Sequence, residues 1–469
     1  MTRLRTFARA TAHLVVLVAL AVPVAAQQLT PSERARIDSA AMAVLAGTGA
    51  PSASIAVVRG GTIVYEHAYG EGRTGTPATT GQRYAIGSVS KQFTATAVLL
   101  LAESGKLSLD DRVGKWFPEL TRSDEVSIRQ LLSMTSGYQD YWPQDYVFTA
   151  MQRETTPAAI MKKWGGQALD FTPGTAWQYS NTNYVIAASI VERVSGMHLM
   201  DFLRQRIFDR LQMTSVADFD AGPLSEADAG PYLRYGIGPL RAAPKEGPRW
   251  LFGAGQLAMT AHDLATWNLG IINQSILKPA SYRAQQTAVT LKNGVSTGYG
   301  LGMNVGMAGA RRRLSHGGAV SGYTTTNVVY PDDKAAITVF TNIYPGGSSA
   351  SGQLAGRIAG IIFAAADTVD AAATALARKV YDGLSHGTID RSLFTPNASD
   401  YFSDAVVADY AASLGPLGAP GEFSAGGSSL RGGLRIRGYR IRAGTVNLNL
   451  TMMQQPDGKI EQYIVERDS

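Results

Sequence analysis

The chain has no cysteine, only 6 histidines in 469 residues, and a charged fraction of 17%. Without cysteine it can form no disulfide, catalytic thiol or cysteine-bound metal site, so its stability must come from its packed core. The histidines show no spacing typical of metal ligands, and we expect neither a metal nor another cofactor. The net charge of +6 is small for this length and favours no nucleic-acid partner.

Long apolar runs are also scarce. The clearest one, Leu14–Val22, follows three arginines and precedes the small residues "VAA". This order is typical of a secretory signal peptide over residues 1–26, cut before Gln27, and the run is too short to span a bilayer. We therefore expect an exported protein, periplasmic or secreted, with no transmembrane anchor. Loss of the three arginines would lower its charge from +6 to +3.

Strand patterns occur at both ends of the main part of the chain. β-Branched runs on either side of Gly60–Gly61 predict a hairpin, and two more runs flank the turn residues Pro331–Asp333. Between about residues 82 and 293 the pattern is mostly helical. We expect an α/β (α+β) fold in which the first and last thirds form one antiparallel sheet, flanked by helices, with an all-helical subdomain between them. Two unrelated domains are the alternative.

The C-terminal part has a different texture. An alanine-rich segment at residues 364–375 predicts a linker or a frayed helix end, and we place a linker at residues 366–375, after a main domain of residues 27–365. Helical and then alternating patterns over residues 376–469 predict a small α+β domain. No motif indicates whether this domain covers an active site, binds the cell envelope or mediates oligomers, and the oligomeric state is left open.

A serine is followed three residues later by a lysine in "GSVSKQF", at the start of a run too apolar for a surface helix. A serine hydroxyl is a poor nucleophile at neutral pH, and a serine hydrolase needs a base beside it. If a helix carries Ser88 and Lys91, this spacing puts both on one face. The helix dipole and burial would both favour a neutral lysine. The pattern predicts an activated serine; the alternative is a helix cap and a solvated lysine.

Two further serine motifs have less support. "SILK" at residues 275–278 repeats S-x-x-K just before Pro279, where no helix can carry the pair. "GLSHG" at residues 383–387 fits G-x-S-x-G, which needs a strand before its serine and a histidine later in the chain. The preceding segment has a helical pattern, and the only later histidine is the next residue. We interpret both as chance matches.

The first S-x-x-K motif is joined by two others. The chain has one Y-x-N, Tyr179–Asn181 in "FTPGTAWQYSNTNY", and one H-x-G, His316–Gly318 in "LSHGGAVSGY". With these motifs the chain resembles the penicillin-recognising, β-lactamase-related serine hydrolases. The branch includes class C β-lactamases, D-alanyl-D-alanine carboxypeptidases, D-aminopeptidases and related bacterial esterases. The resemblance covers about residues 30–365 and implies a β-lactamase/transpeptidase-like fold.

The resemblance also implies catalytic roles. Ser88 would be the nucleophile, and Lys91 would help to deprotonate it. Tyr179, as a phenolate or a proton shuttle, would take the serine proton and pass one to the leaving group. Asn181 would bind the substrate amide or the lysine. His316 would replace the lysine of the commoner K-T-G motif and tune Tyr179 electrostatically.

The remaining implied residues bear on the substrate. Gly317 and Gly318 would let the substrate approach the strand, and the N–H groups of Ser88 and Ala319 would form the oxyanion hole. Relatives that bind a β-lactam or D-Ala carboxylate have hydroxyls near this strand, and Gly317 and Ala319 have none. We therefore expect a serine hydrolase that acts through an acyl-enzyme on ester, peptide or amide substrates. The alternatives are a class C-like β-lactamase or D,D-carboxypeptidase, and a catalytically silent envelope-binding scaffold.

Overall fold

The computed structural model describes residues 28–144, 146–347, 349–364 and 368–468. The expected signal peptide, residues 1–26, lies outside the described residues. The chain divides into two compact units, the first ending at Ile362 and the second beginning at Phe363.

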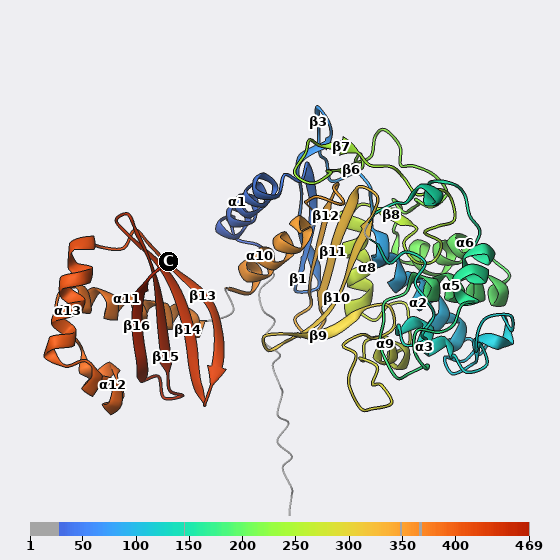
Figure 1. Ribbon diagram of the computed structural model, residues 1–469. Coiled ribbons are helices and arrows are strands. Elements are labelled where there is room, and N and C mark those ends of the chain that lie inside the picture. The colour runs from blue at the N-terminus through green and yellow to red at the C-terminus, as the bar shows by residue number, and fades with distance from the viewer. Residues whose placement is uncertain (1–27, 145, 348, 365–367, 469) are drawn as a thin grey trace, which may run out of the picture. The chain divides into compact units, whose positions relative to one another are not determined.

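A seven-stranded antiparallel sheet forms the centre of the first unit, in the order β3-β2-β1-β12-β11-β10-β9 (Figure 1). Strand β1 pairs with both β2 and β12, so strands from the first and last thirds of the chain lie side by side. This confirms the predicted sheet. It excludes the alternative that the two strand regions of the main part of the chain belong to two unrelated domains. The strands are β1 Ser52–Arg59, β2 Thr62–Arg73, β3 Thr76–Pro77, β9 Asn304–Ala308, β10 Arg311–Val320, β11 Tyr323–Tyr330 and β12 Ala335–Thr341.

Helices cover both faces of this sheet. Figure 1 shows α1 and α10 on one face, and α8 followed by the helical region on the other. The helices are α1 Pro31–Thr48, α2 Ser90–Glu103, α3 Ile128–Leu132, α4 Pro157–Ile160, α5 Asn181–Ser195, α6 Leu199–Leu203, α7 Asp209–Leu211, α8 Ala261–Ile272, α9 Pro279–Gln285 and α10 Ala350–Ala364. Helix α2 is buried along 12 of its 14 residues, which explains its apolar sequence.

The middle of the chain, between the strands of its first and last thirds, is not wholly helical. This corrects the expectation of an all-helical subdomain. Very short strands form a three-stranded sheet in the order β4-β8-β5 and a pair β6-β7. Strands of two or three residues are too short to show a two-residue period, so no pattern indicated them. Their bounds are β4 Tyr84–Ala85, β5 Ala217–Asp218, β6 Tyr232–Leu233, β7 Arg241–Ala242 and β8 Leu257–Met259.

The second unit is a four-stranded antiparallel sheet, in the order β13-β14-β15-β16, with three helices. Its elements are α11 Thr368–Ser385, α12 Pro396–Tyr401, α13 Asp404–Leu414, β13 Glu422–Arg431, β14 Leu434–Ala443, β15 Val446–Gln454 and β16 Ile460–Arg467. Helix α11 occupies residues 368–375, where a linker was expected. Alanine is the strongest helix former, and Ala373 and Ala377 lie in this unit's hydrophobic core.

None of the described helices combines the length and the apolar character needed to cross a bilayer.

Candidate active site

Ser88 lies in a short 3₁₀ helix, Gly87–Val89, that leads directly into α2. The apolar residues of α2 anchor this turn in the main hydrophobic core. Gly87 has a φ of +51°, a conformation that favours glycine, and a Cβ there would lie 2.7 Å from the backbone nitrogen of Ala319 on β10. The nucleophile candidate is therefore held against a strand that is distant in the sequence.

Lys91 is completely buried beneath Ser88, with 0% exposure. Its Nζ lies 3.0 Å from Ser88 Oγ, 2.8 Å from Asn181 Oδ1 and 2.8 Å from the carbonyl oxygen of Ala254. Burial lowers the pKa of Lys91 to about 7, although the nearby carboxylate of Asp140 opposes this shift. A neutral amine would give its two N–H groups to Asn181 and Ala254, and its lone pair would then face Ser88.

Tyr179 is half-buried, with its ring centroid 4.9 Å from Lys91 Nζ and 6.2 Å from the ring centroid of His316. Burial raises the pKa of Tyr179 above its ordinary value, although a hydrogen bond with Ser88 acts in the opposite direction. The side chain is therefore a neutral phenol at neutral pH. Of the two roles expected for Tyr179, a raised pKa disfavours the phenolate and is compatible with the proton shuttle.

His316 is buried on β10, and both of its ring nitrogens have partners. Nδ1 lies 2.5 Å from the carbonyl oxygen of Gly317, and Nε2 lies 2.9 Å from Tyr299 Oη. Since a carbonyl only accepts, Nδ1 carries the proton in the neutral ring. Burial, together with electrostatic repulsion from Lys91, lowers the pKa of His316 to about 4. The imidazole ring is therefore neutral at neutral pH. It would act on Tyr179 through its dipole and not through a positive charge.

Gly318 packs closely against the turn that carries Ser88. A Cβ at Gly318 would lie 1.9 Å from the carbonyl oxygen of Ile86, next to the Ser88 turn. A Cβ at Gly317 would meet only the carbonyl oxygen of Thr325, at 3.7 Å. Gly318 thus lets the turn pack against β10, whereas Gly317 is exposed at the cleft. Ser88 and Ala319, whose N–H groups are the expected oxyanion hole, both line the cleft.

Asp140 was missed by the sequence patterns. It lines the cleft and accepts hydrogen bonds from the backbone N of Asn181 at 2.9 Å and from Asn181 Nδ2 at 3.2 Å. Asp140 therefore caps the N-terminus of α5 and directs Asn181 Oδ1 toward Lys91. Burial raises the pKa of Asp140. No local spacing could reveal a partner 41 residues away.

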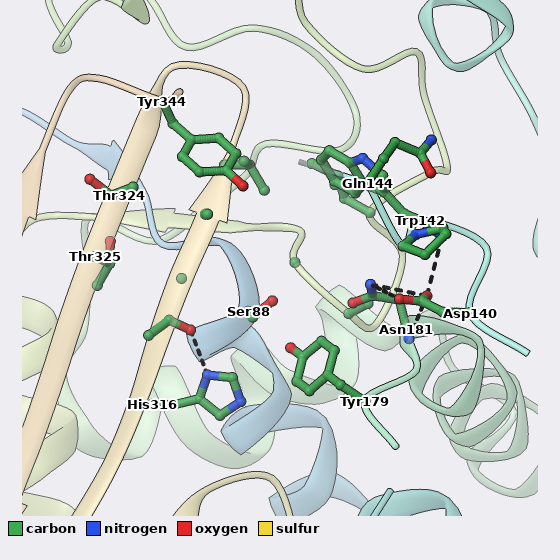
Figure 2. Close-up of a pocket in the computed structure, with 18 of the residues that line it drawn as sticks. Ser88, Asp140, Trp142, Gln144, Tyr179, Asn181, His316, Thr324, Thr325 and Tyr344 are labelled. Atoms are coloured by element: carbon green, nitrogen blue, oxygen red, sulfur yellow. Dashed lines mark hydrogen bonds between the residues drawn. The ribbon is translucent and has the colours of Figure 1, made fainter. Parts of the chain in front are cut away.

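These side chains surround a cleft of about 700 Å³. Figure 2 shows Ser88 near Tyr179 and His316, with Asp140 and Asn181 hydrogen-bonded beside them. Thr324, Thr325 and Thr326 of β11 also line the cleft. The Thr324 hydroxyl bonds Thr341 Oγ1 and the carbonyl oxygen of Ile343, and the Thr326 hydroxyl bonds Ser351 Oγ. Gly317 and Ala319 supply no hydroxyl, so the substrate preference drawn from these two residues stays a prediction.

The two chance matches lie outside this cleft. Ser275 and Lys278 fall between α8 and α9, so no helix carries the pair, as predicted. Ser385 ends α11, and its Oγ lies 3.1 Å from His386 Nδ1 and donates to the carbonyl oxygen of Asp382 at 2.9 Å. A helix rather than a strand precedes it, so it is no nucleophile elbow. Among the described residues, no group of three or more acidic or histidine side chains is placed to hold a metal.

Comparison with known proteins identifies the family. The family named Beta-lactamase matches residues 37–359, more than half of the chain. The protein belongs to this family. The resemblance drawn from the three motifs is therefore confirmed, and with it the fold class.

Several relatives are hydrolases by name. Over 311 residues the chain is 27% identical to penicillin-binding protein 4* of Bacillus subtilis, covering 62% of this chain and 67% of that protein. Over 336 residues it is 30% identical to a D-aminopeptidase of Brucella anthropi, covering 68% and 62%. It thus spans less than two thirds of that enzyme. A D-stereospecific amidohydrolase from Streptomyces sp. superposes with a TM-score of 0.61 at 25% identity, covering 70% and 97%.

Proposed function

We propose that this protein is a serine hydrolase that cleaves amide, peptide or ester bonds through an acyl-enzyme on Ser88. The observation that carries the proposal is the buried Lys91, with Nζ 3.0 Å from Ser88 Oγ and a pKa lowered to about 7. A base with a pKa near the working pH is efficient in proton transfer. A buried lysine beside a serine has no evident use in a catalytically silent scaffold.

The proposed reaction begins when Ser88 Oγ attacks the carbonyl carbon of the substrate and loses its proton to Lys91 Nζ. The carbonyl oxygen becomes an oxyanion, which the N–H groups of Ser88 and Ala319 stabilise. Tyr179, a neutral phenol, donates its proton to the leaving amine or alcohol and regains one from Lys91. A water molecule then attacks the ester of Ser88, with the same groups acting in reverse, and releases the acid.

The substrate is proposed from the cleft and from the relatives. Two of the similar proteins are named D-aminopeptidase and D-stereospecific amidohydrolase, and these names support an amide or peptide substrate for this chain. A second, apolar pocket of about 320 Å³ adjoins the main cleft. It shares Trp142 and Tyr344 with the cleft and is also lined by Val147 and Leu233. It suits an aromatic or aliphatic group on the substrate. We also propose export, so that the substrate is met in the periplasm or outside the cell.

The proposal is tested with a fluorophosphonate probe and mass spectrometry on the purified protein. We expect a single adduct on Ser88 that is absent in Ser88→Ala. A panel of D- and L-amino-acid amides, p-nitrophenyl esters and a chromogenic cephalosporin then ranks the substrates by kcat/KM. No adduct and no turnover on folded protein would favour the scaffold; cephalosporin turnover above that of the amides and esters would favour a β-lactamase.

A further inference from the structure

A second cavity lies wholly within the C-terminal unit and shares no residue with the proposed active site. It has a volume of about 520 Å³, within the usual range of small-molecule sites. Residues of α11, the β13–β14 hairpin and the β15–β16 turn line it. Its walls include Ala372, Ala373 and Leu376 of α11 and Leu430 of β13, which is 68% exposed at the rim. This side of the cavity is apolar.

Four polar residues line the other side, and one of them, Gln455, donates from Nε2 to Glu461 Oε2 at 3.2 Å. Arg435 and Arg437 come from β14, and Gln454 comes from β15. Arg437 is only 6% exposed, and its Nη1 donates to Gln454 Oε1 at 2.8 Å. Gln454 Nε2 in turn donates to the carbonyl oxygen of Gly458 at 3.0 Å, which orients the amide. The described residues that line the cavity include no aspartate or glutamate.

The strand period explains why two arginines face this cavity. Side chains alternate along "RIRGYRIR", so Arg435, Arg437, Tyr439 and Ile441 share one face of β14. Tyr439 and Ile441 lie in the unit's hydrophobic core. Along this face of β14, the first two side chains are therefore arginines and the next two belong to the hydrophobic core. Arg440 belongs to the opposite, exposed face.

We propose that this cavity binds a small organic anion whose carboxylate or phosphate head meets Arg435 and Arg437 and whose apolar body lies against α11 and Leu430. A guanidinium keeps its charge at every physiological pH and matches two oxygens of a carboxylate or phosphate. The exposed Arg435 supplies accessible donors, and Arg437, which bonds Gln454, supplies a second guanidinium group beside them. This binding site is independent of the proposed hydrolase reaction.

The test is isothermal titration calorimetry on the full chain with decanoate and decyl phosphate, beside the neutral 1-decanol and the cationic decyltrimethylammonium. We expect one anion to bind per chain, and the tighter of the two to identify the head group. Arg435→Gln, at an exposed position, should weaken binding about tenfold or more. Ala372→Phe, which fills the apolar side, should remove it.

Arg440→Gln is the matched control, because it removes the same charge from the other face of the same strand. Its affinity for the anion should stay within about twofold of the wild-type value, since it leaves the charge-assisted contacts intact. The proposal is overturned if neither anion binds, if 1-decanol binds as tightly, or if Arg440→Gln weakens binding as much as Arg435→Gln. Hydrolysis at Ser88, measured on the same variants, should not change, so each proposal can fail separately.

Discussion

The chain carries the S-x-x-K pattern twice, and the two copies have opposite surroundings. Ser88 and Lys91 lie on consecutive helical turns, with the lysine completely buried and Nζ 3.0 Å from the serine oxygen. Ser275 is exposed in a loop, and Lys278 is extended at the start of α9 with its side chain in solvent. The comparison teaches that burial and a continuous helix, rather than the four letters, produce a lysine that can act as a base.

The largest effect should come from the two serines. Ser88→Ala removes the proposed nucleophile and should lower kcat by roughly 10⁴-fold or more. Ser275→Ala changes an exposed loop and should leave kcat within about twofold, because surface substitutions rarely disturb the fold. Steady-state kinetics on an activated ester would measure both. Equal losses in the two variants would break the comparison.

The two lysines should separate almost as widely. Lys91→Met removes the proposed base and should lower kcat by about 10²–10⁴-fold, whereas Lys278→Met should not. Between pH 7 and about 10 an unfolded lysine still holds its proton, but buried Lys91, with a pKa of about 7, has lost it. The free energy of unfolding of the wild type should therefore rise with pH across this window. Urea titrations should find a smaller rise in Lys91→Met.

Each copy also has a tyrosine nearby. Tyr179→Phe removes the proposed proton shuttle and should lower kcat by about 10²-fold. Tyr282, whose Oη accepts from the backbone N of Ile276 beside the second copy, makes only structural bonds. Tyr282→Phe should lower the melting temperature and leave kcat of the folded protein nearly unchanged. A kcat that is insensitive to Tyr179→Phe would argue against the shuttle.

The packing of the Ser88 turn on β10 can be tested at two adjacent glycines. Gly318→Ala brings a Cβ against the carbonyl oxygen of Ile86 and should displace the turn, lowering kcat about 10²-fold. Gly317→Ala has room and should change kcat by less than about fivefold, with a larger effect on KM if the proposed substrate lies beside it. Comparable kcat losses would show that the turn does not depend on this contact.

The smallest effect concerns the pKa of Lys91. The carboxylate of Asp140 raises this pKa, so Asp140→Asn should lower it and shift the acidic limb of the kcat/KM profile downward by up to about one pH unit. Asp201→Asn, at an exposed position, should leave the limb in place. An unchanged or upward-shifted limb in Asp140→Asn would show that another group controls it.

Local patterns predicted much of the fold. The hairpin around Gly60–Gly61 and the strands flanking Pro331–Asp333 follow from turn chemistry and periodicity, and both are confirmed. The short strand β8 was not predicted, and the start of α11 was predicted only as an alternative to a linker. Two or three residues carry no period, and alanine is common both in linkers and in helices.

The sequence determined which reactive groups exist and, through three short motifs, the family to which they belong. Ser88, Lys91, Tyr179 and His316 were recognisable because each stands in a motif of fixed spacing. The sequence already suggested a neutral lysine, but the extent of burial, which lowers the pKa values of Lys91 and His316 and raises that of Tyr179, came from the tertiary structure. The tertiary structure also decided that Asp140 supports Asn181 and that Gly318 admits the Ser88 turn. The physical reason is that desolvation and close packing depend on neighbours far away in the chain, which no local spacing records.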